Sequence, residues 1–201
     1  VIKSYFHSFF KSDKSNIKVC IGRAGNVIGG GDWAKDRIVV DCMVAWSEGN
    51  TLEIRAPKAT RPWQHVLEPI SGYLNLGSEI YKDASLHGES FNFGPKAEQN
   101  HTVEELIIDL SMLWNFKKGT TPYKVTNNVS FHEASQLKLN CDKALAQLKW
   151  QANFNYEQTI KATSEWYFDF YNSDKNMYAK TTEQIKHYEN LAKRKGLMWS
   201  N

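Results

Sequence analysis

Five glycines lie within the stretch CIGRAGNVIGGGDW, residues 20–33, and they constrain the fold more than any other feature of the chain. Glycine is frequent where a backbone turns sharply or approaches a ligand closely, as in loops that cradle a dinucleotide phosphate. Such a loop needs glycines at G-x-G-x-x-G or G-x-x-G-x-x-G spacing, with an acidic residue after the second strand. Here the glycines fall at 22, 25, 29, 30 and 31, and no such acid follows. The stretch therefore predicts a strand that runs into a glycine-rich turn.

Hydrophobic periodicity predicts strands that alternate with helices, which is the signature of an α/β protein. Helices are expected at residues 4–11, 36–49, 65–81, 102–114, 140–150 and 155–171, and strands at 17–22, 51–57 and 89–95. Thr102 with Glu105 and Asn155 with Gln158 have capping-box spacing, and Asn140 is a plausible N-cap. The helices from residue 102 onward are expected to form a cap or second lobe.

Composition narrows the class of protein. The chain has 201 residues, of which 41% are hydrophobic, so it can bury a sizeable core. Its net charge of +3 is mild and no dense basic stripe is visible, which argues against a nucleic-acid partner. Charged residues interrupt the apolar opening segment too often for a signal peptide or membrane span. Cys20, Cys42 and Cys141 lack metal-site spacing, so we expect no metal and reduced thiols in a cytoplasmic protein.

Three motifs then carry a resemblance that periodicity cannot supply. GNVIGGGDW is followed by RPWQHVLEP, and later by HEASQLKLNCDKALAQLKW. In this combination the chain resembles the C-terminal portion of the CDP-glucose 4,6-dehydratase family, which belongs to the extended short-chain dehydrogenase/reductases. The resemblance covers the chain up to about residue 173 and is loose in the tail.

The resemblance implies the late part of a Rossmann-type fold together with a smaller mixed α/β substrate-binding lobe. Residues 1–32 and 65–95 would form the Rossmann-type part, residues 33–64 and 96–173 the lobe, and residues 174–201 a helical tail on the surface. The glycine-rich turn would then follow a late strand and face the ligands, instead of being the dinucleotide fingerprint loop.

The family's chemistry, as the resemblance implies it, uses NAD and a CDP-sugar. CDP-glucose is oxidised at C4, water is lost across C5 and C6, and hydride returns to C6 to give CDP-4-keto-6-deoxyglucose. The family's phosphate-binding loop and Tyr-x-x-x-Lys pair match nothing in this chain, so none of its residues is expected to be catalytic. By itself the chain is expected to be inactive, and the full-length protein is expected to be a homo-oligomer.

Nine residues are carried over as candidate ligand contacts. Asn26 and Arg61 match positions near the sugar diphosphate, and a guanidinium suits two phosphate oxygens. Glu133 matches an acidic position near ribose hydroxyls. Further candidates for the substrate are Asp32, Trp33, Arg37 and Arg55, and for the cofactor Ala24 and Val27.

Several candidates also have a purely structural interpretation, and two other functions stay open. Asn26 could stabilise a turn, Arg61 and Glu133 could be solvated surface residues, and Trp33 could belong to the core. His65 and His132 are more simply interpreted as structural histidines. A sugar-nucleotide epimerase, or a non-catalytic module that binds nucleotide sugars, would share most of these residues.

Overall fold

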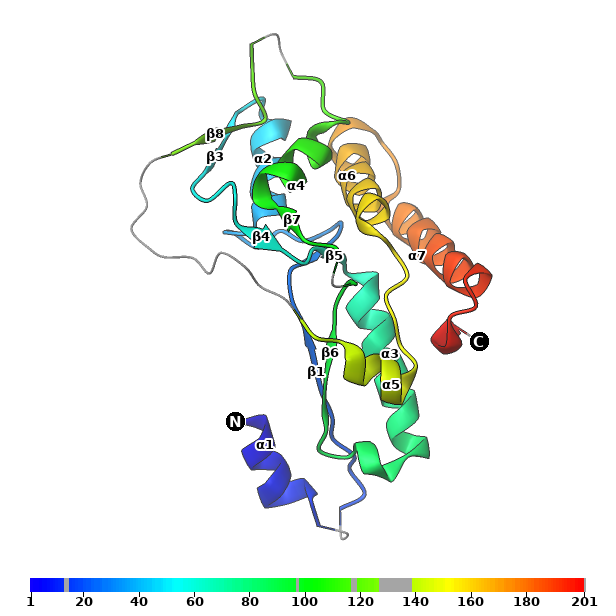
Figure 1. Cartoon of the computed structure of the whole chain (residues 1–201). Coiled ribbons are helices and arrows are strands. Elements are labelled where there is room, and N and C mark those ends of the chain that lie inside the picture. Colours follow the sequence, from blue (N-terminus) through cyan, green and yellow to red (C-terminus); the bar gives the residue numbers. More distant parts are fainter. Residues whose placement is uncertain (13–14, 97, 117–118, 127–138, 201) are drawn as a thin grey trace.

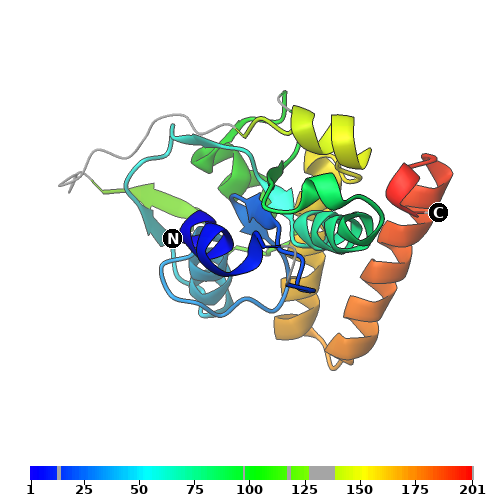
Figure 2. The ribbon, with the colours of Figure 1, turned by 90° about the horizontal axis from the view of Figure 1, so that it is seen from below.

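The structure, a computed structural model, describes residues 1–12, 15–96, 98–116, 119–126 and 139–200. Strands and helices alternate in its first half, and the later helices lie alongside them (Figures 1 and 2). The elements are α1 (Ile2–Tyr5), a π-helical turn (Phe6–Phe10), β1 (Ile21–Ala24), β2 (Val27–Ile28), α2 (Ile38–Ser47), β3 (Leu52–Ile54), β4 (Thr60–Arg61), β5 (Gln64–His65), α3 (Leu67–Lys82), a 3-10 turn (Ala84–Leu86), β6 (Ser90–Phe93), β7 (His101–Thr102), α4 (Val103–Ser111), β8 (Tyr123–Val125), α5 (Asp142–Leu148), α6 (Tyr156–Asn172), α7 (Met177–Arg194) and a final 3-10 turn (Met198–Ser200). This confirms the α/β prediction.

Strand β1 pairs in parallel with β6, with Ile21 opposite Ser90 and Ala24 opposite Phe93. The strand was expected to begin at residue 17, but it begins at Ile21 because β6 provides partners only from Ser90 onward. The described residues form three further strand pairs. Strand β2 pairs with β5 and β3 pairs with β8 in parallel, whereas β4 pairs with β7 antiparallel. Consequently the glycine-rich turn begins at the carboxyl end of a parallel strand, where open α/β sheets bind ligands.

Two hydrophobic clusters hold most of the buried side chains. The first includes residues of α2, β3, α4 and α6, among them Met43, Leu106 and Tyr167. The second joins α3 and β6 to α5, and Trp150 lies within it. Helix α5 therefore packs with the β1–β6 pair, although the sequence-based division, which stays a prediction, assigned residues 142–148 to the lobe.

Helix caps follow the sequence closely. Both expected capping boxes, at Thr102 and at Asn155, are present. The predicted cap at Asn140 is wrong by one residue, because α5 is preceded by Cys141 as its N-cap. The Asn140 Oδ1 atom instead accepts a hydrogen bond from the backbone N–H of Asp142 at 2.9 Å, in a turn just before the helix.

Close packing explains why the turn after β2 is glycine-rich. The Trp166 ring of α6 lies directly on the backbone of Gly30, where an added Cβ atom would be 2.1 Å from the indole. Gly31 has φ of +83°, a backbone conformation that residues with a side chain rarely adopt. Gly29 is crowded by Val66, 2.8 Å from the position of an added Cβ atom. These glycines therefore let α6 and the start of α3 approach the turn.

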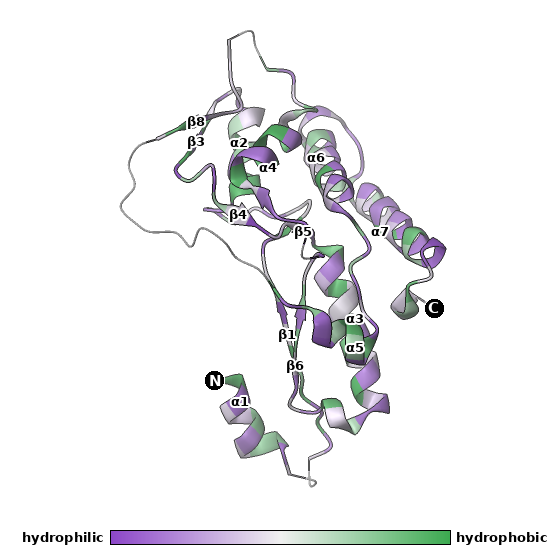
Figure 3. Cartoon of the chain, in the orientation of Figure 1, coloured by the Kyte–Doolittle hydropathy of each residue, from purple (hydrophilic) through white to green (hydrophobic). Residues whose placement is uncertain are grey.

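Helix α7, which was expected to be a surface helix, is largely hydrophilic (Figure 3) but has one buried face. Tyr188 and Ala192 are buried on that face. The helix also pairs by charge with α6, where Lys180 reaches Asp169 at 3.1 Å and Glu165 at 3.6 Å.

A buried carboxylate, Glu68 at the start of α3, connects three parts of the fold. Its Oε2 atom accepts hydrogen bonds from the Asn153 backbone N–H at 2.8 Å and the Tyr188 hydroxyl at 2.9 Å. Its Oε1 atom accepts one from the Phe154 backbone N–H at 2.7 Å. Burial raises the pKa of Glu68 to about 7, and these three bonds and Lys195 oppose the rise.

Glu68 predicts an unusual dependence of stability on pH. Between pH 4.5 and 7 the folded protein keeps this proton while the unfolded chain releases it, so the contribution of Glu68 to stability falls as pH rises through that range. The free energy of unfolding of the wild type minus that of Glu68→Gln should decrease by up to about 3 kcal/mol over this interval. Denaturant unfolding at a series of pH values measures it. A difference that stays constant or increases would contradict the prediction.

The glycine packing predicts opposite effects at two positions. Gly30→Ala should lower the free energy of unfolding by about 1–3 kcal/mol, because the methyl group overlaps Trp166. Gly77, exposed in α3 with nothing within 4 Å of an added Cβ atom, is the matched control. Gly77→Ala should raise the free energy of unfolding by roughly 0.5–1 kcal/mol. Equal effects at the two positions, measured by thermal and denaturant melts, would show that packing does not explain Gly30.

Candidate functional site

A cleft of about 410 Å³ lies beside the glycine-rich turn, and it collects residues that are far apart in the sequence. The turn provides one wall and the start of α2 another, and residues of β3, β4, α4 and α6 also line the cleft. Of the nine candidate contacts, six line this cleft: Asn26, Val27, Asp32, Arg37, Arg55 and Arg61.

Asn26 lies between β1 and β2 in the left-handed region, with φ of 51°. Asparagine tolerates this conformation better than most side chains. Its backbone carbonyl accepts a hydrogen bond from the Gln64 backbone N–H at 3.2 Å, which fixes the turn against β5. Its buried Oδ1 atom has no hydrogen-bond partner among the described residues. The residue thus serves the turn and also leaves a polar atom unsatisfied at the cleft.

Three arginines come to the cleft from separate elements. Arg37 is the exposed N-cap of α2, Arg55 is exposed directly after β3, and Arg61 is half-buried on β4. An Nη1 hydrogen of Arg61 is donated to the carbonyl oxygen of Thr60 at 2.9 Å. Burial alternates along β3, since Leu52 and Ile54 are buried whereas Glu53 is exposed. Three guanidinium groups around one cleft suit a ligand with several phosphate oxygens.

Acidic residues that the sequence analysis did not single out share the cleft. Asp36, Asp41 and Glu53 line it together with Asp32. Partial burial, and then the nearby Asp36, raise the pKa of Asp41. Carboxylates of this kind can accept hydrogen bonds from sugar hydroxyls, so the lining suits a ligand that combines anionic and hydroxyl-rich parts. Asp36 belongs to the DWAKDR segment, which also contains three of the chosen candidates, Asp32, Trp33 and Arg37.

Tyr167 is the lining residue that sequence reasoning could not find, because it lies 135 positions after the turn. Its hydroxyl donates to the Asp32 carbonyl at 2.7 Å and accepts from the Asp32 backbone N–H at 3.2 Å. Chiefly through burial, the pKa of Tyr167 is raised to about 12, so the hydroxyl keeps its proton at neutral pH.

Two further candidates, Trp33 and Ala24, lie outside the cleft lining. Trp33 is not among the lining residues; its ring packs on α6, with centroids 4.8 Å from Phe170 and 5.5 Å from Tyr167. Ala24 is the half-buried last residue of β1. Glu133 and His132 lie outside the described residues.

His65 is a buried residue of β5 and has a structural role, as expected. Its Nδ1 atom accepts a hydrogen bond from the Leu67 backbone N–H at 3.3 Å, at the start of α3. Burial lowers its pKa to about 4, so the imidazole is neutral at pH 7. Its Nε2 atom has no hydrogen-bond partner among the described residues.

The described part of the chain holds no group of three or more His, Cys, Asp or Glu side chains placed to bind a metal ion. None of its helices has both the length and the apolar character needed to cross a membrane. The three cysteines are free thiols.

Comparison with known proteins gives one clear sequence relative. The chain is 36% identical over 170 residues to the CDP-glucose 4,6-dehydratase of Salmonella typhimurium strain LT2, and the match covers 83% of this chain and 46% of that protein. The chain thus spans less than half the length of the curated relative that it matches. No protein-family model matches it.

Solved structures agree on the fold. The dTDP-glucose 4,6-dehydratase of Bacillus anthracis, solved with NAD, has a TM-score of 0.63 and 16% identity over 84% of this chain and 48% of its own. The UDP-glucuronic acid 4-epimerase of Bacillus cereus, solved with UDP-glucuronic acid and NAD, has a TM-score of 0.66 and 18% identity over 84% and 49%. The chain therefore resembles CDP-glucose 4,6-dehydratase in sequence, as its motifs indicated, and it has part of the Rossmann-type fold of the nucleotide-sugar dehydratase and epimerase compared above.

Proposed function

We propose that this chain forms the nucleotide-sugar site of an NAD-dependent CDP-glucose 4,6-dehydratase, which converts CDP-glucose to CDP-4-keto-6-deoxyglucose and water. The observation that carries the proposal is the meeting of Asn26, Arg37, Arg55 and Arg61 at one cleft. These residues were carried over from the family resemblance, and the sequence relative is a dehydratase of this name.

The parts of the ligand are assigned by chemistry. A diphosphate carries its charge in ground and transition states alike, and the half-buried Arg61 is proposed to hold it with its planar fork. The Asn26 amide can donate to the same group without a charge to desolvate. Arg55 is proposed to stack on cytosine, and Asp32, Arg37 and Trp33 to bind or support the sugar end. Glu133 stays a proposed ribose contact.

NAD, when bound, supplies the hydride acceptor and donor of the reaction. Ala24 and Val27 fit a position beside it, because they end β1 and begin β2 at the carboxyl edge of a parallel pair. Val27 is 37% exposed, and Asn26, whose buried Oδ1 atom has no hydrogen-bond partner among the described residues, lies between the two in the sequence. We assign no proton transfer to residues of this chain, which binds, orients and shields the substrate.

Two other functions compete with this proposal. An epimerase has the same fold, and structural neighbours include epimerases. A non-catalytic module would bind the nucleotide sugar without turnover.

We propose a cytoplasmic location for the protein because its cysteines are free thiols. We also propose that the protein is a homo-oligomer.

Arg61 provides the first test, in the full-length protein. Arg61→Ala should weaken CDP binding about ten- to hundredfold, because a hydrogen bond to a charged group contributes roughly 1.5–3 kcal/mol. Arg61→Lys should weaken it less, because it keeps the charge but loses the fork. In turnover the effect should appear mainly in KM. Titration calorimetry measures the affinities.

Arg194→Ala, in the last turn of α7 and away from the cleft lining, is the control and should leave CDP affinity unchanged. If Arg61→Ala lowers the melting temperature but binds CDP as the wild type does, Arg61 has no place in the binding site.

The nucleotide base of the ligand provides a second test. CDP should compete with CDP-glucose better than UDP or dTDP does, because a site built for cytosine leaves its polar groups unpaired with another base. Competition titrations with the three nucleotides measure this order. Equal competition by all three would favour the epimerase.

A further inference from the structure

Helix α6 holds the glycine-rich turn of the cleft through contacts of three kinds. Trp166 lies on the backbone of Gly30, and Trp33 packs against the same helix. The Tyr167 hydroxyl makes both hydrogen bonds that the Asp32 backbone offers, at 2.7 and 3.2 Å. Because one phenol fixes a donor and an acceptor of the same residue, it sets the path of the backbone at Asp32.

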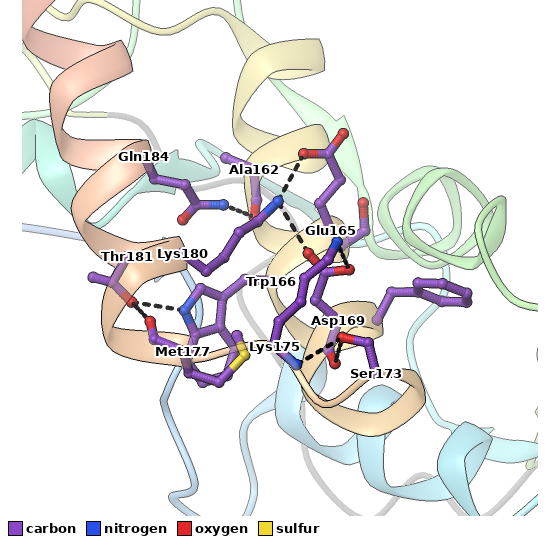
Figure 4. Close-up of polar contacts among 12 residues, drawn as sticks. Ala162, Glu165, Trp166, Asp169, Ser173, Lys175, Met177, Lys180, Thr181 and Gln184 are labelled. Carbon is purple, nitrogen blue, oxygen red and sulfur yellow. Dashed lines mark hydrogen bonds and ion pairs between the residues drawn. The ribbon is translucent and has the colours of Figure 1, made fainter.

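Helix α7 in turn fixes the position of α6 (Figure 4). The Trp166 Nε1–H group donates to the Thr181 Oγ1 atom at 2.9 Å, which orients the indole that lies on Gly30. Lys180 reaches two carboxylates of α6, and the Gln184 side-chain amide donates to the Ala162 carbonyl oxygen at 2.8 Å. A chain of contacts therefore runs from the tail helix through Trp166 to the turn.

The turn held in this way forms part of the cleft wall. Gly29, Asp32 and Tyr167 all line it, next to Arg37. Asp32 is exposed. The contacts that the protein makes with the Asp32 backbone therefore determine the position of this residue in the cleft wall.

We propose that Tyr167 and Trp166 are positioning residues for nucleotide-sugar binding, and that the α6–α7 hairpin presets the turn of residues 29–33 against the ligand. This inference rests on the proposed function. It gives the tail helix, where the resemblance to the family is loose, a role in the affinity of the site.

Tyr167→Phe tests the inference, because it keeps the buried ring and removes both hydrogen bonds to Asp32. Backbone hydrogen exchange of peptides that cover residues 29–36 should become several-fold faster. CDP affinity should fall about three- to tenfold, since the wild type binds with its turn already in place. Thr181→Val, which removes the hydrogen-bond acceptor of Trp166, should change both quantities in the same direction.

Tyr171→Phe is the matched control, because Tyr171 lies one turn further along α6 and its ring also contacts Trp33. It should leave exchange and affinity as in the wild type. Thermal melts of all variants identify any general loss of folding.

The outcomes separate the inference from the function. If the wild type does not bind CDP, the proposed function is wrong, and the proposed role of the turn in binding fails with it. If the wild type binds and Tyr167→Phe binds equally tightly, the function stands and the positioning role is wrong. Unchanged hydrogen exchange at residues 29–36 in Tyr167→Phe overturns the inference whatever the titration gives.

Discussion

The contact of Trp166 with the Gly30 backbone is the constraint on which the rest of the cleft depends. A large ring lies where a side chain at position 30 would stand, so the helix and the turn approach each other more closely than two ordinary surfaces could. Through Thr181, the indole is also one of the points where α7 contacts α6. Gly29 and Gly30 therefore have a steric reason and Gly31 a conformational one, and the turn lines a ligand cleft without using phosphate-cradle spacing.

Charge in the cleft is mixed, and this is informative about the ligand. A site for a simple anion would gather arginines alone, whereas Arg37, Arg55 and Arg61 here share the lining with four carboxylates. Guanidinium groups donate hydrogen bonds to phosphate oxygens, and carboxylates accept hydrogen bonds from hydroxyl groups. A nucleotide sugar presents both kinds of group a few ångströms apart, which is the physical basis for preferring it to a simple anion or an acidic peptide.

Glu68 of α3, the helix that packs on the β1–β6 pair, connects that part of the fold to the tail helix α7. Its carboxylate accepts from two successive backbone N–H groups just before α6 and from Tyr188 of α7, so one buried group fixes the entry to α6 and the packing of α7. Because α6 holds the turn of the cleft, this interior network supports the site from a distance. The buried carboxylate costs stability when it is ionised, and the three donors offset part of that cost.

The sequence by itself determined most of the local structure and the identity of many candidate contacts. Both capping boxes, the alternation along β3 and the order of strands and helices follow from interactions between residues within a few positions of each other. The motifs around Asn26 and Arg61 selected residues that meet at the cleft. Only the tertiary structure decided that Trp33 turns toward α6, that α5 packs with the β1–β6 pair, and that Tyr167 and Asp41 line the cleft. These depend on contacts between residues up to 135 positions apart, and spacing within a segment carries no information about which distant side chain fills a given gap.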